Sequence, residues 1–371
     1  MTTFITRLDG REGRPEGIRL GVKDAIDVAG VPTTAGSRVV AASAPPAQSD
    51  AMCLAGARAA GARIVGKTNL HELCFGATGV NPWFGTPVNP LDPSLIPGGS
   101  SSGSAVAVAT GDADVAFGTD TGGSVRNPSA CCGTVGLKTT WGRVPLKGVW
   151  PLAPSLDTVG PMARDIAGVV TGMQLLEPDF STGSRGAAMV GRVRLAGTDP
   201  LIDEAIGLAL DAAELSVFDL DLPGWAEAAQ AGITLMFAEA LQANRELVAT
   251  EGLRLGADLQ ARFASAAALS TDAVDAARAC RARWRDELGR AFQKVQVLAV
   301  PAMLTFPPRL IDPAVEPNRA AVAVSLAGHP ALAQPVPAGG HLPASLQLVG
   351  PDGAEDLLLA TGAVVELAAS T

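Results

Sequence analysis

The first 165 residues show a repeated succession of short apolar runs, glycine-rich stretches and alanine-rich segments. The apolar run 18–28 carries one charged pair, Lys23-Asp24, and has the pattern of a short buried strand. Gly, Pro, Asn and Ser are abundant over 75–103, which predicts loop. The other elements predicted in this part are a helix over 49–60, a strand over 62–68, a helix over 104–111 and a strand over 112–124. This succession of strand, loop and helix indicates an α/β fold with a largely buried sheet.

The pattern changes after about residue 165. Few glycines or prolines interrupt 224–294, and its pattern is strongly helical. The other elements predicted here are a helix and connector over 166–190, strands over 296–304 and 342–350, and a closing helix over 355–368. Apart from an alanine bias there is no repeat or low-complexity tract, so we expect a single domain over 1–371. Its expected parts are a catalytic core over 1–165, a mostly helical, substrate-shaping region over 190–295 and a return to the core sheet over 296–371.

Composition narrows the class of protein. Hydrophobic residues make up 47% of the 371 and charged residues only 18%, which allows a large core and argues against intrinsic disorder. The net charge of -9 argues against a general electrostatic grip on nucleic acid. The first residues lack the apolar core of a signal peptide and no run of 18 apolar residues occurs, so we expect a cytoplasmic protein without a membrane span. In that reducing compartment we expect the five cysteines to be free and mostly packed.

Two segments place serine directly after paired glycines. They are 97–104, PGGSSSGS, and 118–126, GTDTGGSVR, and the serines that follow the glycine pairs are Ser100 and Ser124. Glycine lets backbone N–H groups approach a ligand, and consecutive N–H groups form a concave site for negative charge. An acyl-transfer enzyme needs such a site for its tetrahedral intermediate. A flexible linker or an anion-binding loop is the alternative for 97–104 taken alone.

A serine hydroxyl becomes a useful nucleophile when a base takes its proton. Histidine is the usual base, but none of the three histidines lies in either glycine-serine segment, so a Ser-His-Asp triad is unsupported without being excluded. Lysine is a known substitute. Lys23 stands in an apolar strand, where burial lowers the pKa of the ammonium and leaves a neutral amine. A structural ion pair with Asp24 is the alternative for this lysine.

Four blocks of the chain, in order, resemble the amidase signature family. They are GVKDAIDVAGVPTTAGS, GKTNLHELCFGATG, NPLDPSLIPGGSSSGSAVAVATG and FGTDTGGSVRNPSACCGTVGLKTT, with a weaker match at LAVPAML and LPASLQLVGP. The resemblance implies the amidase signature fold, an α/β fold with a large twisted mixed β-sheet core flanked by helices on both faces. It also implies a Ser–cis-Ser–Lys triad with Ser124 as nucleophile, Ser100 as the bridging serine in a cis peptide and Lys23 as base.

The resemblance extends to the surroundings of the nucleophile. The backbone N–H groups that it implies for the oxyanion hole are those of Thr121, Gly122, Gly123 and Ser124. It implies that Thr119 is a hydroxyl near the triad, and that Asp120 and Arg126 hold the turn through a salt bridge. Arg126 as a direct substrate ligand is the alternative. Further candidates for lining the substrate site are Arg143, Trp141 and Trp150.

The chain also departs from the family pattern. The lysine at position 23 leaves out much of the common N-terminal helical extension, and the chain is short after residue 165, so we expect an open pocket, one completed by a partner, or one built for a small amide. Where the family often has Asn in an N-x-x-G-x-P stretch, this chain has Ser325. The pair His71-Glu72 begins an H-E-x-x-H zinc motif that residue 75, a phenylalanine, does not complete, so we expect a helix surface and no metal.

Three functions remain open. The leading one is a free-standing amidase that hydrolyses a small carboxamide or urea-like amide through a serine acyl-enzyme, without a cofactor, and releases ammonia or an amine. The first alternative is a glutaminase-type subunit of a transamidation complex, similar to glutamyl-tRNA amidotransferase. The second is a catalytically silent binding protein on the same fold. The expected partners are a small-molecule amide and either further copies of the chain or a small partner subunit, with no nucleic acid and no membrane.

Overall fold

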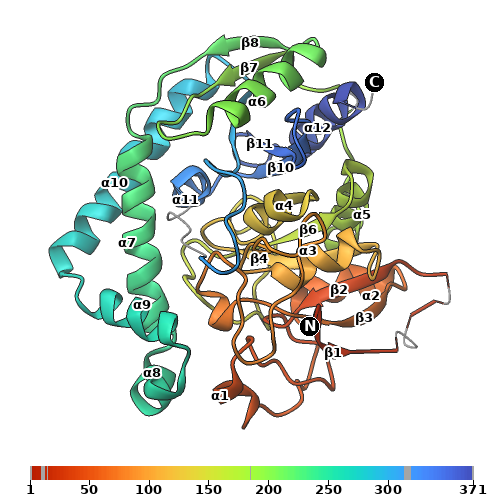
Figure 1. The fold of residues 1–371 in the computed structure, drawn as a ribbon, viewed down its shortest axis with the longest axis vertical. Coiled ribbons are helices and arrows are strands. Elements are labelled where there is room, and N and C mark those ends of the chain that lie inside the picture. Colours follow the sequence, from red (N-terminus) through yellow and green to blue (C-terminus); the bar gives the residue numbers. More distant parts are fainter. Residues whose placement is uncertain (1, 10–12, 15, 184, 313–318, 370–371) are drawn as a thin grey trace.

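The apolar runs form one mixed sheet of eleven strands in the computed structural model, which describes residues 2–9, 13–14, 16–183, 185–312 and 319–369 (Figure 1). The strands are β1 (Phe4–Arg7), β2 (Arg19–Lys23), β3 (Arg63–Thr68), β4 (Val115–Asp120), β5 (Val135–Lys138), β6 (Thr158–Ala163), β7 (Met189–Arg192), β8 (Ser216–Asp219), β9 (Val297–Pro301), β10 (Ala331–Val336) and β11 (Ala344–Val349). Their order across the sheet is β1-β3-β2-β4-β6-β5-β10-β11-β9-β7-β8. Strands from the first 165 residues therefore form one half of the sheet and later strands form the other.

Helices cover both faces of this sheet, as the resemblance implied. The α-helices are α1 (Arg38–Ala41), α2 (Ala55–Ala59), α3 (Ser102–Ala109), α4 (Arg126–Cys132), α5 (Ile166–Leu176), α6 (Pro200–Ala212), α7 (Trp225–Ala243), α8 (Arg245–Glu251), α9 (Ala257–Ala267), α10 (Thr271–Phe292), α11 (Arg319–Ala327) and α12 (Glu355–Ala369). Short 3-10 turns lie at η1 (Met52–Leu54), η2 (Glu72–Cys74) and η3 (Gly252–Arg254). Among the helices that the structure describes, none has the length and apolarity that a membrane crossing needs.

Alternation along the central strands explains how one sheet serves two layers of helices. On β10, Leu332 packs into a core shared with α5, α6 and α12, while its neighbour Ala333 packs into a second core shared with α3 and α4. On β6, Ala163 and Met162 divide between the same two cores. Successive side chains of a strand point to opposite faces, so both faces are apolar here and the strands read as continuous hydrophobic runs.

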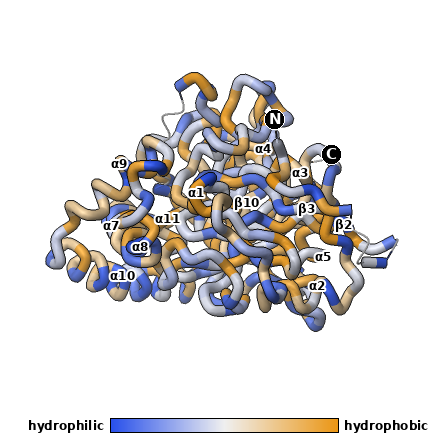
Figure 2. The backbone as a smooth tube through the Cα atoms, turned by 90° about the horizontal axis from the view of Figure 1, so that it is seen from below, coloured by the Kyte–Doolittle hydropathy of each residue, from blue (hydrophilic) through white to orange (hydrophobic). Residues whose placement is uncertain are grey.

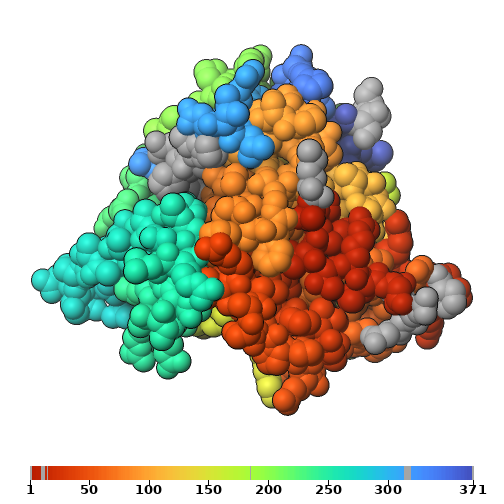
Figure 3. Space-filling model, turned by 60° about the horizontal axis from the view of Figure 1, so that its bottom comes forward, coloured from red at the N-terminus to blue at the C-terminus, as the bar shows by residue number. Residues whose placement is uncertain are grey.

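The region expected to be helical over 224–294 is an arm of helices beside the sheet (Figure 1). Its two long helices, α7 and α10, pack through Trp225 and Trp284, whose rings meet edge to face with centroids 5.4 Å apart. Along α10 hydrophilic segments alternate with apolar ones at the rim of the molecule (Figure 2). The far end of the arm, with α9, lies against segments from the first hundred residues (Figure 3), where Phe263 shares a core with Phe75. The arm therefore closes over one end of the sheet.

Candidate active site

Two neighbouring parallel strands bring the expected site residues together. β2 and β4 run in the same direction, with Leu20 opposite Val115, so their carboxyl ends meet at one edge of the sheet. Lys23 is the last residue of β2 and Asp120 is the last of β4. Both side chains are fully buried. In an α/β sheet the carboxyl edge of the strands is the usual place for ligand binding.

Lys23 is held between two hydroxyls. Its Nζ lies 2.7 Å from Ser100 Oγ and 2.6 Å from Thr119 Oγ1, both within hydrogen-bond distance. Burial lowers the pKa of Lys23, and the neighbouring Cys74 thiol opposes that shift. The structural ion pair considered for Lys23 is absent, because Asp24 points elsewhere and its Oδ1 lies 2.8 Å from Nζ of Lys67. Lys23 is thus free of a carboxylate partner among the described residues and suited to the neutral state.

Ser100 and Ser124 lie on adjoining loops. The Gly99–Ser100 peptide is cis, as the resemblance implied. The N–H of Ser101 donates to the carbonyl of Ser124 over 3.1 Å, which fixes the two loops against each other. Ser124 retains 9% exposure and borders a cavity, whereas Ser100 is fully buried behind it. Among the described side chains no hydrogen bond joins the two hydroxyls, so the structure contains the Lys23–Ser100 link of the expected relay and leaves the next link unformed.

The expected oxyanion loop is fixed from both ends. At its start, Thr121 Oγ1 donates to the carboxylate of Asp157 over 2.6 Å, and that carboxylate also accepts from the N–H groups of Leu152 and Ala153. At its end, Gly123 has a φ of 119°, a conformation that a side chain would strain. The N–H of Gly123 donates to Asp120 Oδ1 over 2.8 Å, so this expected oxyanion donor is already engaged.

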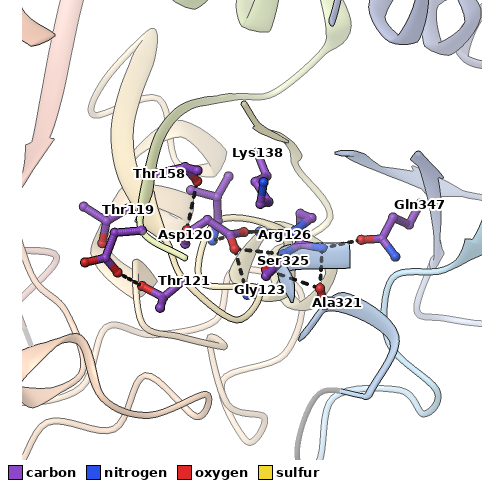
Figure 4. A network of polar contacts seen from close by, with 12 residues as sticks. Thr119, Asp120, Thr121, Gly123, Arg126, Lys138, Thr158, Ala321, Ser325 and Gln347 are labelled. Atoms are coloured by element: carbon purple, nitrogen blue, oxygen red, sulfur yellow. Dashed lines mark hydrogen bonds and ion pairs between the residues drawn. The ribbon is translucent and has the colours of Figure 1, made fainter. Parts of the chain in front are cut away.

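Asp120 and Arg126 form a buried salt bridge beneath this loop (Figure 4). Arg126 Nε lies 3.0 Å from Asp120 Oδ2, and Nη2 lies 2.8 Å from Oδ1, a bidentate arrangement. Burial alone would raise the pKa of Asp120, but the Arg126 charge and the hydrogen bonds lower it to about 2. Both side chains are fully buried, and Arg126 does not border the cavity at Ser124. The alternative of Arg126 as a direct substrate ligand is therefore not supported by its position.

The guanidinium of Arg126 also reaches the end of the chain. Its Nη1 donates to Gln347 Oε1 on β11 over 2.6 Å and to the carbonyl of Ala321 on α11 over 3.0 Å (Figure 4). Its Nη2 donates to Ser325 Oγ over 2.8 Å. Ser325 is the residue that departs from the family pattern, and it accepts a hydrogen bond from the arginine of the nucleophile loop. The loop that carries Ser124 is thereby joined to elements about 200 residues further along the chain.

Lys138 is a second buried amine near this pair. Its Nζ donates to the backbone carbonyls of Thr139 and His329, each over 2.9 Å. Burial lowers the pKa of Lys138 to about 7, and the positive charge of Arg126 adds to the effect. Lys138 is fully buried and does not border the cavity, so it is no rival to Lys23 as a base.

A cavity of about 280 Å³ opens over Ser124. Its floor includes Gly122 and Ser124, and its walls come from the loop after η2 and from α7, α9 and α11. The described residues that line it are Cys74, Phe75, Gly76, Ala77, Thr78, Gly122, Ser124, Asn127, Leu152, Ile233, Met236, Phe237, Arg262 and Val322. The lining is mainly apolar, with a few polar groups beside the serine, which is typical of a site for a small molecule.

Comparison with known proteins assigns the fold and the site to one family. A family model described as Amidase matches residues 7–184 and 204–359. The chain belongs to the Amidase family. The enzyme class expected from the sequence, an amidase of the signature type, is thereby confirmed.

Curated members of the Amidase family are similar along nearly the whole chain. A glutamyl-tRNA(Gln) amidotransferase subunit from Halobacterium salinarum is 34% identical over 425 residues, which cover 99% of this chain and 99% of that protein. The subunit of the same name from Thermus thermophilus is 35% identical and covers 92% of this chain and 83% of that one. A solved structure described as an amidase is 32% identical, with a TM-score of 0.87 over 94% of this chain and 84% of that one.

Several of the expected residues lie away from the Amidase site. Arg143 pairs with Glu177 and Glu355, and neither Trp141 nor Trp150 borders the cavity, so all three candidates for lining were wrong. The indole N–H of Trp141 donates instead to the carbonyl of Pro154, and the ring is 48% exposed.

The pair His71-Glu72 was expected on a helix surface and is buried instead. Glu72 accepts from Ser37 Oγ and from the N–H of Gly256, and His71 Nε2 lies 2.8 Å from Asp258 Oδ2. The pair therefore fastens the start of α9 to the core, because Gly256 and Asp258 flank the first turn of that helix. The five cysteines are buried free thiols, as expected.

Proposed function

We propose that this Amidase family member releases ammonia from the side-chain amide of glutamine as the glutaminase-type subunit of an amidotransferase. The observation that carries the proposal is the similarity to the Halobacterium salinarum subunit over 99% of both chains. This order differs from the sequence analysis, which put a free-standing amidase first. The relatives favour the alternative because the named proteins that match nearly end to end are subunits of that enzyme.

The proposed chemistry begins at Lys23. Its neutral amine accepts the proton of Ser100, and Ser100 in turn accepts the proton of Ser124 as that oxygen attacks the amide carbon. The hydrogen bond of 2.7 Å between Lys23 and Ser100 supports the first transfer. The second requires the two serine hydroxyls to come within hydrogen-bond distance when substrate binds, a tightening that apo sites commonly leave to the complex.

The negative charge on the tetrahedral oxygen is proposed to be held by backbone N–H groups of the loop 121–124. The N–H of Gly122 and that of Ser124 are the best candidates, because both residues border the cavity and the N–H of Gly123 is already bonded to Asp120. The proton then returns through Ser100 to the leaving nitrogen, ammonia departs and an acyl-enzyme remains. Water attacks the ester by the same relay, and the carboxylate leaves.

A free-standing amidase that acts on a small carboxamide is the second candidate. It is supported by the 32% identity to the solved amidase and by a cavity that this chain closes with its own helices. The two candidates share the chemistry at Ser124 and differ in whether other subunits are needed.

Ammonia release separates the candidates. The purified chain is assayed with glutamine and with small aliphatic carboxamides, alone and after mixing with the other amidotransferase subunits and tRNA from the same genome. Glutamine turnover that needs those subunits supports the proposal. Turnover of simple carboxamides by the chain alone, with no gain from the subunits, would contradict it and favour the second candidate. Labelling of Ser124 by a fluorophosphonate probe, with no labelling of Ser124→Ala, tests the shared chemistry.

A further inference from the structure

One charged side chain borders the cavity at Ser124. Among the described lining residues Arg262, on α9, is the only one that carries a charge, and the surrounding wall is mostly apolar. An apolar wall strengthens any electrostatic interaction inside the cavity, because it excludes water from around the charge. A single cation in such a wall favours a ligand with a negative group.

The guanidinium of Arg262 is not consumed by the protein. Its Nε is buried and has no hydrogen-bond partner, and no hydrogen bond runs from its guanidinium to another described residue. The nearest carboxylate, Asp258 one turn earlier, lies 3.7 Å from Nε, which is too far for a hydrogen bond. That carboxylate is held by His71 Nε2 at 2.8 Å, on the side of the core. Phe75 lies beneath the guanidinium, 5.7 Å from the ring centroid, and supports its position.

We propose that Arg262 binds the carboxylate of a substrate whose amide lies at Ser124. The substrate class is then a carboxylic acid with a carboxamide at its other end, such as glutamine or the monoamide of a dicarboxylic acid. The planar fork of an arginine matches a carboxylate with two parallel hydrogen bonds, which fixes the direction in which the ligand enters. This inference rests on the proposed amide cleavage at Ser124 and adds the group that selects the substrate.

The described lining contains no acidic side chain. Glutamine carries an α-ammonium group that would find no carboxylate among these residues, whereas a dicarboxylic acid monoamide carries only the negative charge. Both share the carboxylate that Arg262 would bind. Their relative turnover therefore tells which of the two fits this cavity.

The test compares a charged substrate with a neutral one of similar length. Glutaramate and pentanamide are hydrolysed by the wild type and by Arg262→Gln, in the presence of whichever subunits activity requires. We expect kcat/KM for glutaramate to fall roughly ten- to hundredfold in the variant, the loss typical of a charged hydrogen-bonding partner, with pentanamide nearly unchanged. Glutamine is measured beside them. The matched control is Arg254→Gln, on η3 just before α9, because Arg254 is exposed, pairs with Glu251 and does not border the cavity.

Equal losses for glutaramate and pentanamide in Arg262→Gln would overturn the inference, since a purely structural arginine affects both alike. A wild type that prefers pentanamide would overturn it as well, while leaving the serine chemistry intact.

A binding measurement separates this inference from the proposed function. Calorimetry with glutarate compares Ser124→Ala with the double variant Ser124→Ala/Arg262→Gln, so no turnover is needed. Tighter binding to the first supports the inference even if no amide is cleaved by the wild type. Equal binding, or none to either, would overturn it.

Discussion

Replacement of Asp120 by Asn tests whether the buried pair beneath the nucleophile loop holds the fold together. The substitution keeps the shape of the side chain and an oxygen that can accept from the N–H of Gly123. It removes the negative charge that Arg126 faces at 2.8 Å and 3.0 Å, while the guanidinium stays fully buried. An unpaired buried charge is the costly outcome, because its lost hydration is no longer offset.

Two lines of reasoning give a similar magnitude. Removing one partner of a buried ion pair destabilises a protein by about 3–5 kcal/mol. The pKa of Asp120, about 2 against an ordinary 3.8, corresponds to roughly 2.4 kcal/mol of stabilisation of the charged form, at about 1.36 kcal/mol for each pKa unit. We therefore expect Asp120→Asn to lower the free energy of unfolding by about 2–5 kcal/mol at neutral pH.

The pH dependence follows from the sign of the shift. A carboxyl whose pKa is lower in the folded state contributes stability above its unfolded pKa, and loses it as the pH falls through the folded pKa. The difference between wild type and Asp120→Asn should thus be full at pH 5 and should shrink between about pH 4 and pH 2.

Urea unfolding followed by tryptophan fluorescence measures this difference. The matched control is Asp114→Asn just before the same strand, whose pair with Arg19 is about a third exposed or more on both sides and is expected to contribute about 0–1 kcal/mol. A loss in Asp120→Asn no larger than that in Asp114→Asn would refute the reasoning. So would a difference from wild type that persists unchanged to pH 2.

Three further predictions concern the chemistry at Ser124. Ser124→Ala should reduce amide hydrolysis to background while the melting temperature is kept, and retention of most of the activity would remove Ser124 from the mechanism. Because burial lowers the pKa of Lys23, kcat/KM should rise with pH through that lowered value as the amine loses its proton; a rise only near the ordinary 10.5 would show an amine in water. Thr119→Val removes a hydroxyl 2.6 Å from Nζ of Lys23, and should lower kcat roughly ten- to hundredfold with KM nearly unchanged; a change in KM alone would mean that Thr119 serves binding instead.

The sequence predicted the part of the site that lies in continuous motifs. Lys23, Ser100 and Ser124 each sit in a block of the amidase signature, and β2 and β4, which carry the first and lead to the last, are patterned apolar runs. Short elements escaped prediction. β5, β7 and β8 are four residues each, too short for a periodicity to stand out, and β5 and β7 contain a glycine.

The supporting contacts were harder to predict, because one sequence carries no signal for pairing across 200 residues. Ser325 and Gln347 meet Arg126 only through the order of strands in the sheet. Lys138 is different. It ends the apolar run VGLK just as Lys23 ends RLGVK, so the signal that pointed to one buried amine was present for both. Arg262 is one of many arginines in the helical arm, and nothing in its neighbourhood marks it.

The bonds from Arg126 to α11 and β11 have a consequence for the order in which the enzyme matures. A growing chain contains its lysine and both serines once about a third of it has been made, yet Gln347 and Ser325 come near the end. Until those residues emerge, the arginine under the nucleophile turn lacks three of its acceptors. Hydrolytic competence is therefore acquired last, and a prematurely terminated chain would carry the whole signature without a settled turn to use it.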